Sequence, residues 1–150
     1  RKADEFSFWK EKTDSHSQQL FFKRGVPVDE SGHGGGFVFD CRSLPNPGRY
    51  PEYKDVTGKD LLVIEYLKKE KEVDEFLEHV VALIEQSVEK YLNRGFDHLT
   101  VNFGCTGGQH RSVYLVEQLA EIFQKMNSPT NLPCVVLKRH RELDYNTKTP

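Results

Sequence analysis

Cys105 and Arg111 enclose a glycine-rich stretch, and this spacing carries the first chemistry that the sequence suggests. Glycines let consecutive backbone N–H groups turn toward an anion, and a helix that starts directly after them adds the positive end of its dipole. Arginine is a two-pronged donor to phosphate oxygens, and a histidine donates more strongly when it is protonated. The stretch therefore predicts a phosphate-binding loop whose ligands are Thr106, Gly107, Gly108, His110 and Arg111.

Cysteine-dependent phosphatases use the same spacing between a cysteine and an arginine, so two interpretations of Cys105 stay open. In the first, the start of a helix stabilises a nucleophilic thiolate, and Asp40 on a neighbouring loop is the general acid. In the second, Cys105 is a small buried residue at a crowded turn. We favour the second and assign no catalytic residue. The stretch lacks the Gly-Lys-Ser/Thr of a Walker loop, so ATP hydrolysis has no support.

The elements that must position this loop follow from hydrophobic periodicity. Alternating apolar residues predict a strand over 98–103 before the loop, and a helical pattern runs from the loop to Phe123. A long amphipathic pattern ends at Gly95, and a turn is predicted over 127–133. The other predicted elements are strands at 20–23, 36–41 and 134–137 and a helix over 61–69. This order predicts an α/β fold with a small, mixed, mostly parallel four-stranded sheet and helices packed on it.

Positive residues follow the predicted strands at the points where each strand ends. Arg42 follows the second strand, the glycine loop follows the third, and a basic group follows the fourth. Because ligands bind beyond the carboxyl ends of parallel strands, we expect these groups to converge on one edge of the sheet. Additional phosphate ligands are therefore Arg42, Arg139 and Arg141, and Lys23 and Arg24 would extend this positive patch.

Composition limits the functional classes. The chain has 150 residues, enough for one domain, and it has no apolar run long enough for a membrane helix. Its three cysteines at unpatterned spacings predict a reducing, cytoplasmic setting, and its net charge of −2 gives no overall attraction to nucleic acid. We expect no metal and no cofactor. Because the chain begins at Arg1, we expect an upstream domain to be missing from it.

The motifs resemble those of the C-terminal domain of the RapZ family, whose members are known as RNase adapter or nucleotide-binding proteins. The resemblance rests on Gly104-Cys-Thr-Gly-Gly-Gln-His-Arg-Ser112 and on four further matches that follow the same order along the chain. These are Phe22-Lys-Arg-Gly-Val-Pro-Val-Asp29, Phe37-Val-Phe-Asp-Cys-Arg-Ser-Leu-Pro-Asn-Pro47, Thr57-Gly-Lys-Asp60 and Arg139-His-Arg141. The matches assign residues 20–142 to this domain. Residues 1–19 are polar and lack sustained periodicity, which predicts a linker or docking segment, and residues 143–150 are predicted as a frayed tail.

This resemblance implies a non-catalytic domain that binds glucosamine-6-phosphate through Thr106, Gly107 and Arg111. It also implies homo-oligomers and, as in enterobacterial members, binding of small regulatory RNAs, with Lys23, Cys105 and His110 at positions linked to RNA binding or activity. The candidates for contact with RNA are then Lys23, Arg24, Lys138 and His140. The chain departs from the family pattern at several places, two of which are single positions where some relatives differ. Gly48 stands where they have a histidine, and Gln109 where they have a lysine.

Overall fold

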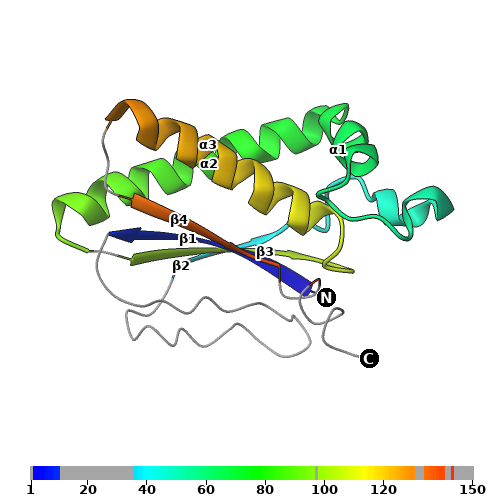
Figure 1. The fold of residues 1–150 in the computed structure, drawn as a ribbon, viewed down its shortest axis with the longest axis horizontal. Coiled ribbons are helices and arrows are strands. Elements are labelled where there is room, and N and C mark those ends of the chain that lie inside the picture. The colour runs from blue at the N-terminus through cyan, green and yellow to red at the C-terminus, as the bar shows by residue number, and fades with distance from the viewer. Residues whose placement is uncertain (1, 11–35, 97, 131–133, 141–142, 144–150) are drawn as a thin grey trace.

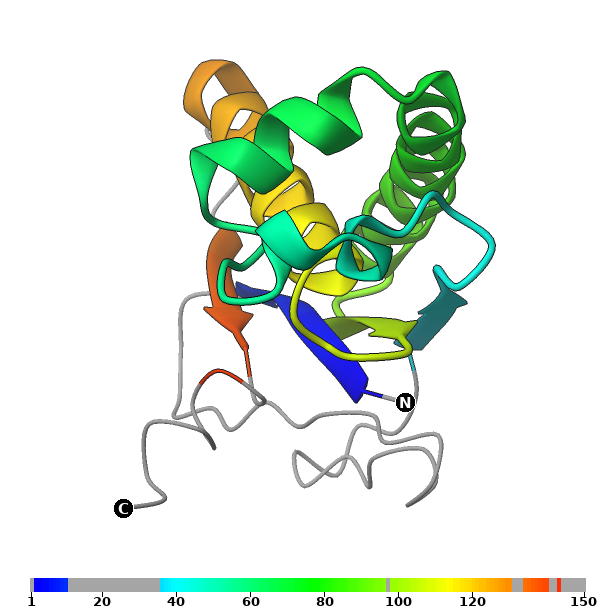
Figure 2. The same cartoon turned by 90° about the vertical axis from the view of Figure 1, so that its right-hand side faces the viewer.

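The computed structural model describes residues 2–10, 36–96, 98–130, 134–140 and 143. Its sheet has the strand order β2-β3-β1-β4, formed by β1 (Lys2–Lys10), β2 (Gly36–Asp40), β3 (His98–Cys105) and β4 (Cys134–Arg139). Helices α1 (Leu61–Lys68), α2 (Lys71–Asn93) and α3 (Arg111–Thr130) lie on one face of this sheet (Figures 1 and 2). The predicted mixed α/β class is confirmed.

The two helices that flank β3 in sequence are amphipathic, and their apolar stripes face the sheet. Alternate residues of β3 point to the same side, where Phe103 packs between the helices and β2. The aromatic ring of Phe39 stacks against Phe103 with centroids 5.6 Å apart and meets Phe76 of α2 edge-on. The core is therefore a single layer between the helices and one face of the sheet. Its fully buried large side chains include Tyr114, Phe103, Leu67, Ile84, Leu115 and Leu119.

The predicted end of α2 at Gly95 is confirmed. Gly95 has a φ of 77° and donates its N–H to the carbonyl of Leu92, while Phe96 donates to the carbonyl of Tyr91. This is the Schellman pattern, and the rings of Tyr91 and Phe96 make the apolar contact that accompanies it. The motif that ends α2 thus extends to Phe96, two residues before β3 begins at His98.

The prediction of a mostly parallel sheet is wrong in its strand pairing. Among the described strands, only β2 and β3 pair in parallel, whereas β1 pairs antiparallel with both β3 and β4. Residues 2–10, predicted as part of a linker, form this central strand, and the strand predicted at 20–23 lies outside the described residues. Crossover helices fix the direction of strands two to four but do not prevent an antiparallel strand from lying between two of them.

The directions of β2, β3 and β4 agree with the prediction because the antiparallel β1 reverses the direction twice. Their carboxyl ends therefore meet at one end of the sheet, where the glycine loop and the start of α3 also lie (Figure 1). The short turns η1 (Pro47–Arg49) and η2 (Pro51–Tyr53) and the start of α1 border the same end.

Helix α3 continues to Thr130, so the turn predicted over 127–133 does not begin at residue 127.

No helix in the described part of the chain is long and apolar enough to span a membrane.

Candidate anion-binding site

The glycine loop between β3 and α3 is held from inside by the sulfur of Cys105. The backbone N–H of Gly108 donates to Cys105 Sγ at 3.1 Å, and the Oγ of Ser112 lies 3.1 Å from the same sulfur. Gly108 has a φ of 64°, a left-handed conformation that glycine adopts without steric cost. The Gly108 amide thus faces inward, whereas Thr106 and Gly107 are exposed at the tip of the loop.

Arg111 is buried, with 3% of its surface exposed, and joins α3 to the end of β2. Its Nη1 donates to the carbonyls of Arg42 and Leu44 at 2.9 Å each, and to that of Cys41 at 3.4 Å. These carbonyls offset the desolvation of the guanidinium, because hydrogen bonds to a charged group contribute roughly 1.5–3 kcal/mol each. Nε and Nη2 make no hydrogen bond to a described residue.

Residues 53–58, which precede α1 and which we call the strap, are hydrogen-bonded to the loop through Gln109 and His110. The amide nitrogen of Gln109 donates to the carbonyls of Lys54 and Val56, at 2.7 and 2.8 Å. Nε2 of His110 donates to the carbonyl of Tyr53 at 2.7 Å, because a carbonyl can only accept. His110 is predicted to donate to an anion. Of its two ring nitrogens, Nε2 is engaged by the carbonyl of Tyr53.

Gly58 lets this strap approach the start of α3 closely. Its N–H donates to the carbonyl of Gln109 at 2.9 Å. A Cβ at position 58 would lie 2.3 Å from the carbonyl oxygen of His110 and 2.4 Å from the backbone nitrogen of Tyr114. Only glycine fits this contact without a backbone shift. Gly107 differs, because a Cβ there would meet nothing within 4 Å.

At the end of β2, Asp40 and Arg42 pair with each other. Nε and Nη2 of Arg42 donate to both carboxylate oxygens of Asp40, and its backbone N–H donates to Oδ1. The hydrogen bond to Asp40 raises the pKa of Arg42 above its ordinary value. Both side chains are partly exposed, and Asp40 lies opposite Gly104 in the parallel pair. This pair is next to the glycine loop, with each charge already matched.

Glu117 on α3 lies close to three basic residues, two at the carboxyl end of β4 and one before α1. Its carboxylate accepts from Nζ of Lys138 at 2.6 Å and from Nε2 of His140 at 2.7 Å, and Nζ of Lys59 lies 3.9 Å away. Burial alone would raise the pKa of Glu117, but the hydrogen bonds and charges of Lys138 and His140 outweigh it and lower the pKa.

The structure thus brings some predicted site residues together and diverts others. Thr106 and Gly107 remain exposed at the loop, while Arg42, Lys138 and His140 are paired with carboxylates. Arg139 ends β4, and its side chain is not described. Lys23, Arg24 and Arg141 lie outside the described residues.

The sequence profile of the RapZ C-terminal domain matches residues 17–144 of this chain. The chain belongs to the RapZ C-terminal domain family. The nucleotide-binding protein of Paracidovorax citrulli is 45% identical to it over 127 residues, covering 85% of this chain and 40% of that protein. A protein of the same name from Albidiferax ferrireducens is 44% identical over 132 residues (88% and 40%), and one from Thermotoga neapolitana is 40% identical over 123 (82% and 40%).

This RapZ-family domain therefore spans about 40% of the length of the curated relatives that it matches. Those relatives are named nucleotide-binding proteins, and the match covers the glycine loop together with the strap and both neighbouring strand ends.

Sequence reasoning missed three residues that shape the site in this RapZ-family domain. Gln109 donates to backbone carbonyls of the strap. Gly58 allows a close approach of two backbone segments, and Glu117 forms an ion cluster. For Glu117 a signal exists in the sequence, because it interrupts the apolar face formed by Val113 and Val116 on α3. Backbone carbonyl acceptors have no residue signature, so Gln109 gave no such signal.

A glycine-to-alanine pair tests the strap. Gly58→Ala should destabilise the domain by about 1–3 kcal/mol in urea denaturation, because overpacking forces the backbone to move. Gly107→Ala makes the same chemical change in open space, and we expect a change below about 0.5 kcal/mol. Equal losses in the two variants would show that the strap is not packed against α3 as described.

The Glu117 cluster predicts a pH dependence of stability. Because the folded-state pKa of Glu117 is lowered, its contribution is present above the ordinary value of 4.5 and is lost as pH falls through the folded-state pKa. Glu117→Gln should cost about 1.5 kcal/mol at neutral pH and flatten the acid limb of a stability–pH curve. Glu121→Gln, which removes an exposed partner of Lys125, is the matched control and should change the curve less.

Proposed function

We propose that this domain binds a phosphorylated aminosugar, with glucosamine-6-phosphate as the first candidate, and catalyses no reaction on it. The proposal places the phosphate on the backbone N–H groups of Thr106 and Gly107, with the Thr106 hydroxyl and the start of α3 beside it. Membership in a family whose curated relatives are named nucleotide-binding proteins supports a phosphate-containing ligand.

The observation that carries the proposal is a rigid loop with an open tip. Gly108, Gln109 and His110 are each hydrogen-bonded inward or to the strap. Thr106 and Gly107 are exposed five and four residues before Arg111, the first residue of the 20-residue helix α3, and a Cβ at Gly107 would meet nothing within 4 Å. A preorganised loop of exposed amides at a helix start favours an anion. The buried charge of Arg111 at that start adds to this preference.

Two features favour binding over phosphatase chemistry. Cys105 is 2% exposed, and its sulfur accepts the Gly108 N–H from within the loop. A nucleophile must reach the substrate within a few ångströms, which a buried sulfur behind the loop does not do. Asp40, the candidate general acid, is bound by Arg42 on both carboxylate oxygens.

The neighbouring charges favour a small ligand over RNA. Lys138 and His140, the predicted RNA contacts that the structure describes, both bind Glu117. The exposed Asp40–Arg42 pair next to the loop offers one carboxylate and one guanidinium. Because Arg42 is already paired with Asp40, this pair adds no uncompensated positive charge for a polyphosphate backbone, and its carboxylate would repel one.

Calorimetry with glucosamine-6-phosphate tests the assignment. Gly107→Val fills the open tip and Thr106→Val removes the hydroxyl. Each should weaken binding at least about tenfold, which corresponds to about 1.4 kcal/mol. Thermal melting of each variant checks that the fold is kept. Arg111→Ala is a poor probe, because it leaves three carbonyls around a buried gap.

Ligand controls separate the parts of the proposal. Glucosamine without phosphate should bind far more weakly, and glucose-6-phosphate should bind less well than the aminosugar. Affinity that is unchanged in both loop variants would overturn the site. Binding to a structured RNA that falls steeply with salt, without any binding of the phosphosugar, would favour the RNA hypothesis instead.

A further inference from the structure

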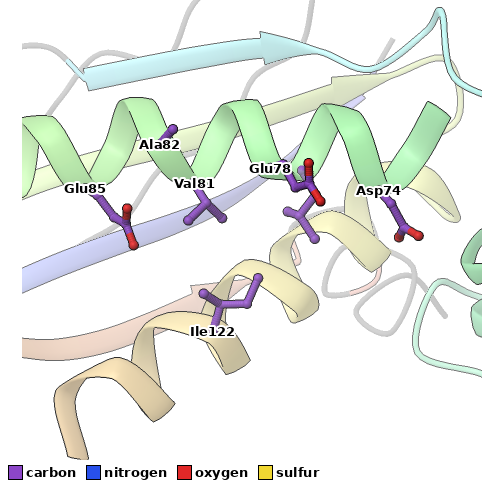
Figure 3. Close-up of a pocket in the computed structure, with 7 residues that line it drawn as sticks. Asp74, Glu78, Val81, Ala82, Glu85 and Ile122 are labelled. Carbon is purple, nitrogen blue, oxygen red and sulfur yellow. The ribbon is translucent and has the colours of Figure 1, made fainter. Parts of the chain in front are cut away.

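A groove is lined by residues of α2 and α3 (Figure 3), two helices that lie on one face of the sheet (Figure 2). It encloses about 380 Å³. Apolar side chains of both helices form its floor, and carboxylates of α2 form its edge. The lining residues are Asp74, Leu77, Glu78, Val81, Ala82, Glu85 and Ile122. None of them belongs to the glycine loop or to the strap.

The carboxylates are arranged in a stripe along α2. Asp74, Glu78 and Glu85 are four and seven residues apart, so they share one side of the helix, with Val81 between the last two. Figure 3 shows these side chains pointing from α2 toward α3, from which Ile122 points back. The stripe therefore combines negative charge with an apolar strip at helical spacing.

These carboxylates have no ion-pair partner in the described part of the chain. The acidic residues that are paired lie elsewhere, for example Glu75 with Lys71 and Glu121 with Lys125. Helix α2 carries six acidic residues against two lysines, so its field stays negative along the groove. Uncompensated like charges facing a groove repel one another and are stabilised when a cationic partner binds.

We propose that this groove docks a basic amphipathic helix of a partner protein. Lysine or arginine side chains on one side of that helix would meet Asp74, Glu78 and Glu85, and its apolar side would cover Val81 and Ile122. A helix that lays its apolar face into a groove between two helices is a recurring mode of recognition. An RNA or another polyanion does not fit here, because three carboxylates line the approach.

The proposal is independent of the phosphosugar site. The groove is lined by residues 74–85 of α2 and by Ile122 of α3, eleven residues after α3 begins, whereas the glycine loop precedes α3. Ligand binding and helix docking can therefore occur on the same domain at the same time, and failure of one proposal leaves the other in place.

Two charge-matched triple variants provide the test. Asp74→Asn, Glu78→Gln and Glu85→Gln together neutralise the groove, and Glu72→Gln, Glu75→Gln and Glu89→Gln neutralise the same helix outside it. The probe is a labelled 20-residue designed helix with Lys and Arg on one side and Leu and Ile on the other, measured by fluorescence anisotropy. The groove triple should weaken binding at least tenfold and the control triple less than threefold. Ile122→Ser should also weaken it.

Several results would overturn the proposal. Equal effects of the two triples would show general electrostatic attraction without a docking site. Equal binding of a scrambled peptide of the same composition would exclude a helix face. Sedimentation that shows self-association of the chain, lost only in the groove triple, would make a second copy of this chain the occupant. Circular dichroism of each variant confirms that α2 and α3 are intact.

Discussion

The guanidinium of Arg111 joins the start of α3 to the end of β2, and the geometry of the glycine loop depends on this bond. The side chain is buried and donates to carbonyls on both sides of the turn that follows β2. Removing a buried charge from its acceptors is costly, so the two segments cannot separate without a large loss of stability. The loop at the end of β3 is therefore fixed between two anchored elements. Arg111 therefore anchors the start of α3 through the hydrogen bonds of Nη1, and its positive charge lies next to the loop that precedes this helix.

The loop is rigid because its inward groups are satisfied by the protein itself. Cys105 Sγ holds Gly108, the strap carbonyls hold Gln109 and His110, and Gly58 allows the strap to lie against α3. The tip formed by Thr106 and Gly107 is what remains exposed. A loop that keeps its shape without ligand pays little ordering entropy when it binds. The predicted anion-binding motif thus contains two kinds of residue. Gly108, Gln109 and His110 hold the loop in its conformation, and Thr106 and Gly107 face outward.

Periodicity predicted the helices, the strand before the loop and the common direction of β2, β3 and β4, because these depend on local apolar patterns and on crossover connections. It missed β1, since Lys2-Ala-Asp-Glu5 places charged residues at the start of a strand that lies between two others. The carboxyl ends of β2, β3 and β4 lie at one end of the sheet, but the prediction that positive groups converge there did not anticipate the partners of the described ones. Arg42 meets Asp40 and Lys138 meets Glu117, and such pairings depend on side-chain geometry that residue order does not encode.

The central place of β1 has a consequence for how the chain folds. Strand β4 contacts the rest of the sheet only through β1, and β1 pairs Lys2 with Cys105 and Glu5 with Arg139, more than a hundred residues away in each case. Contacts between such distant residues form late, because closing a long loop costs entropy before the pairing rewards it. We expect β2, α2, β3 and α3 to assemble first, since β2 and β3 pair directly and share one core. The amino-terminal strand then completes the sheet, so folding begins near the glycine loop and ends at the opposite edge.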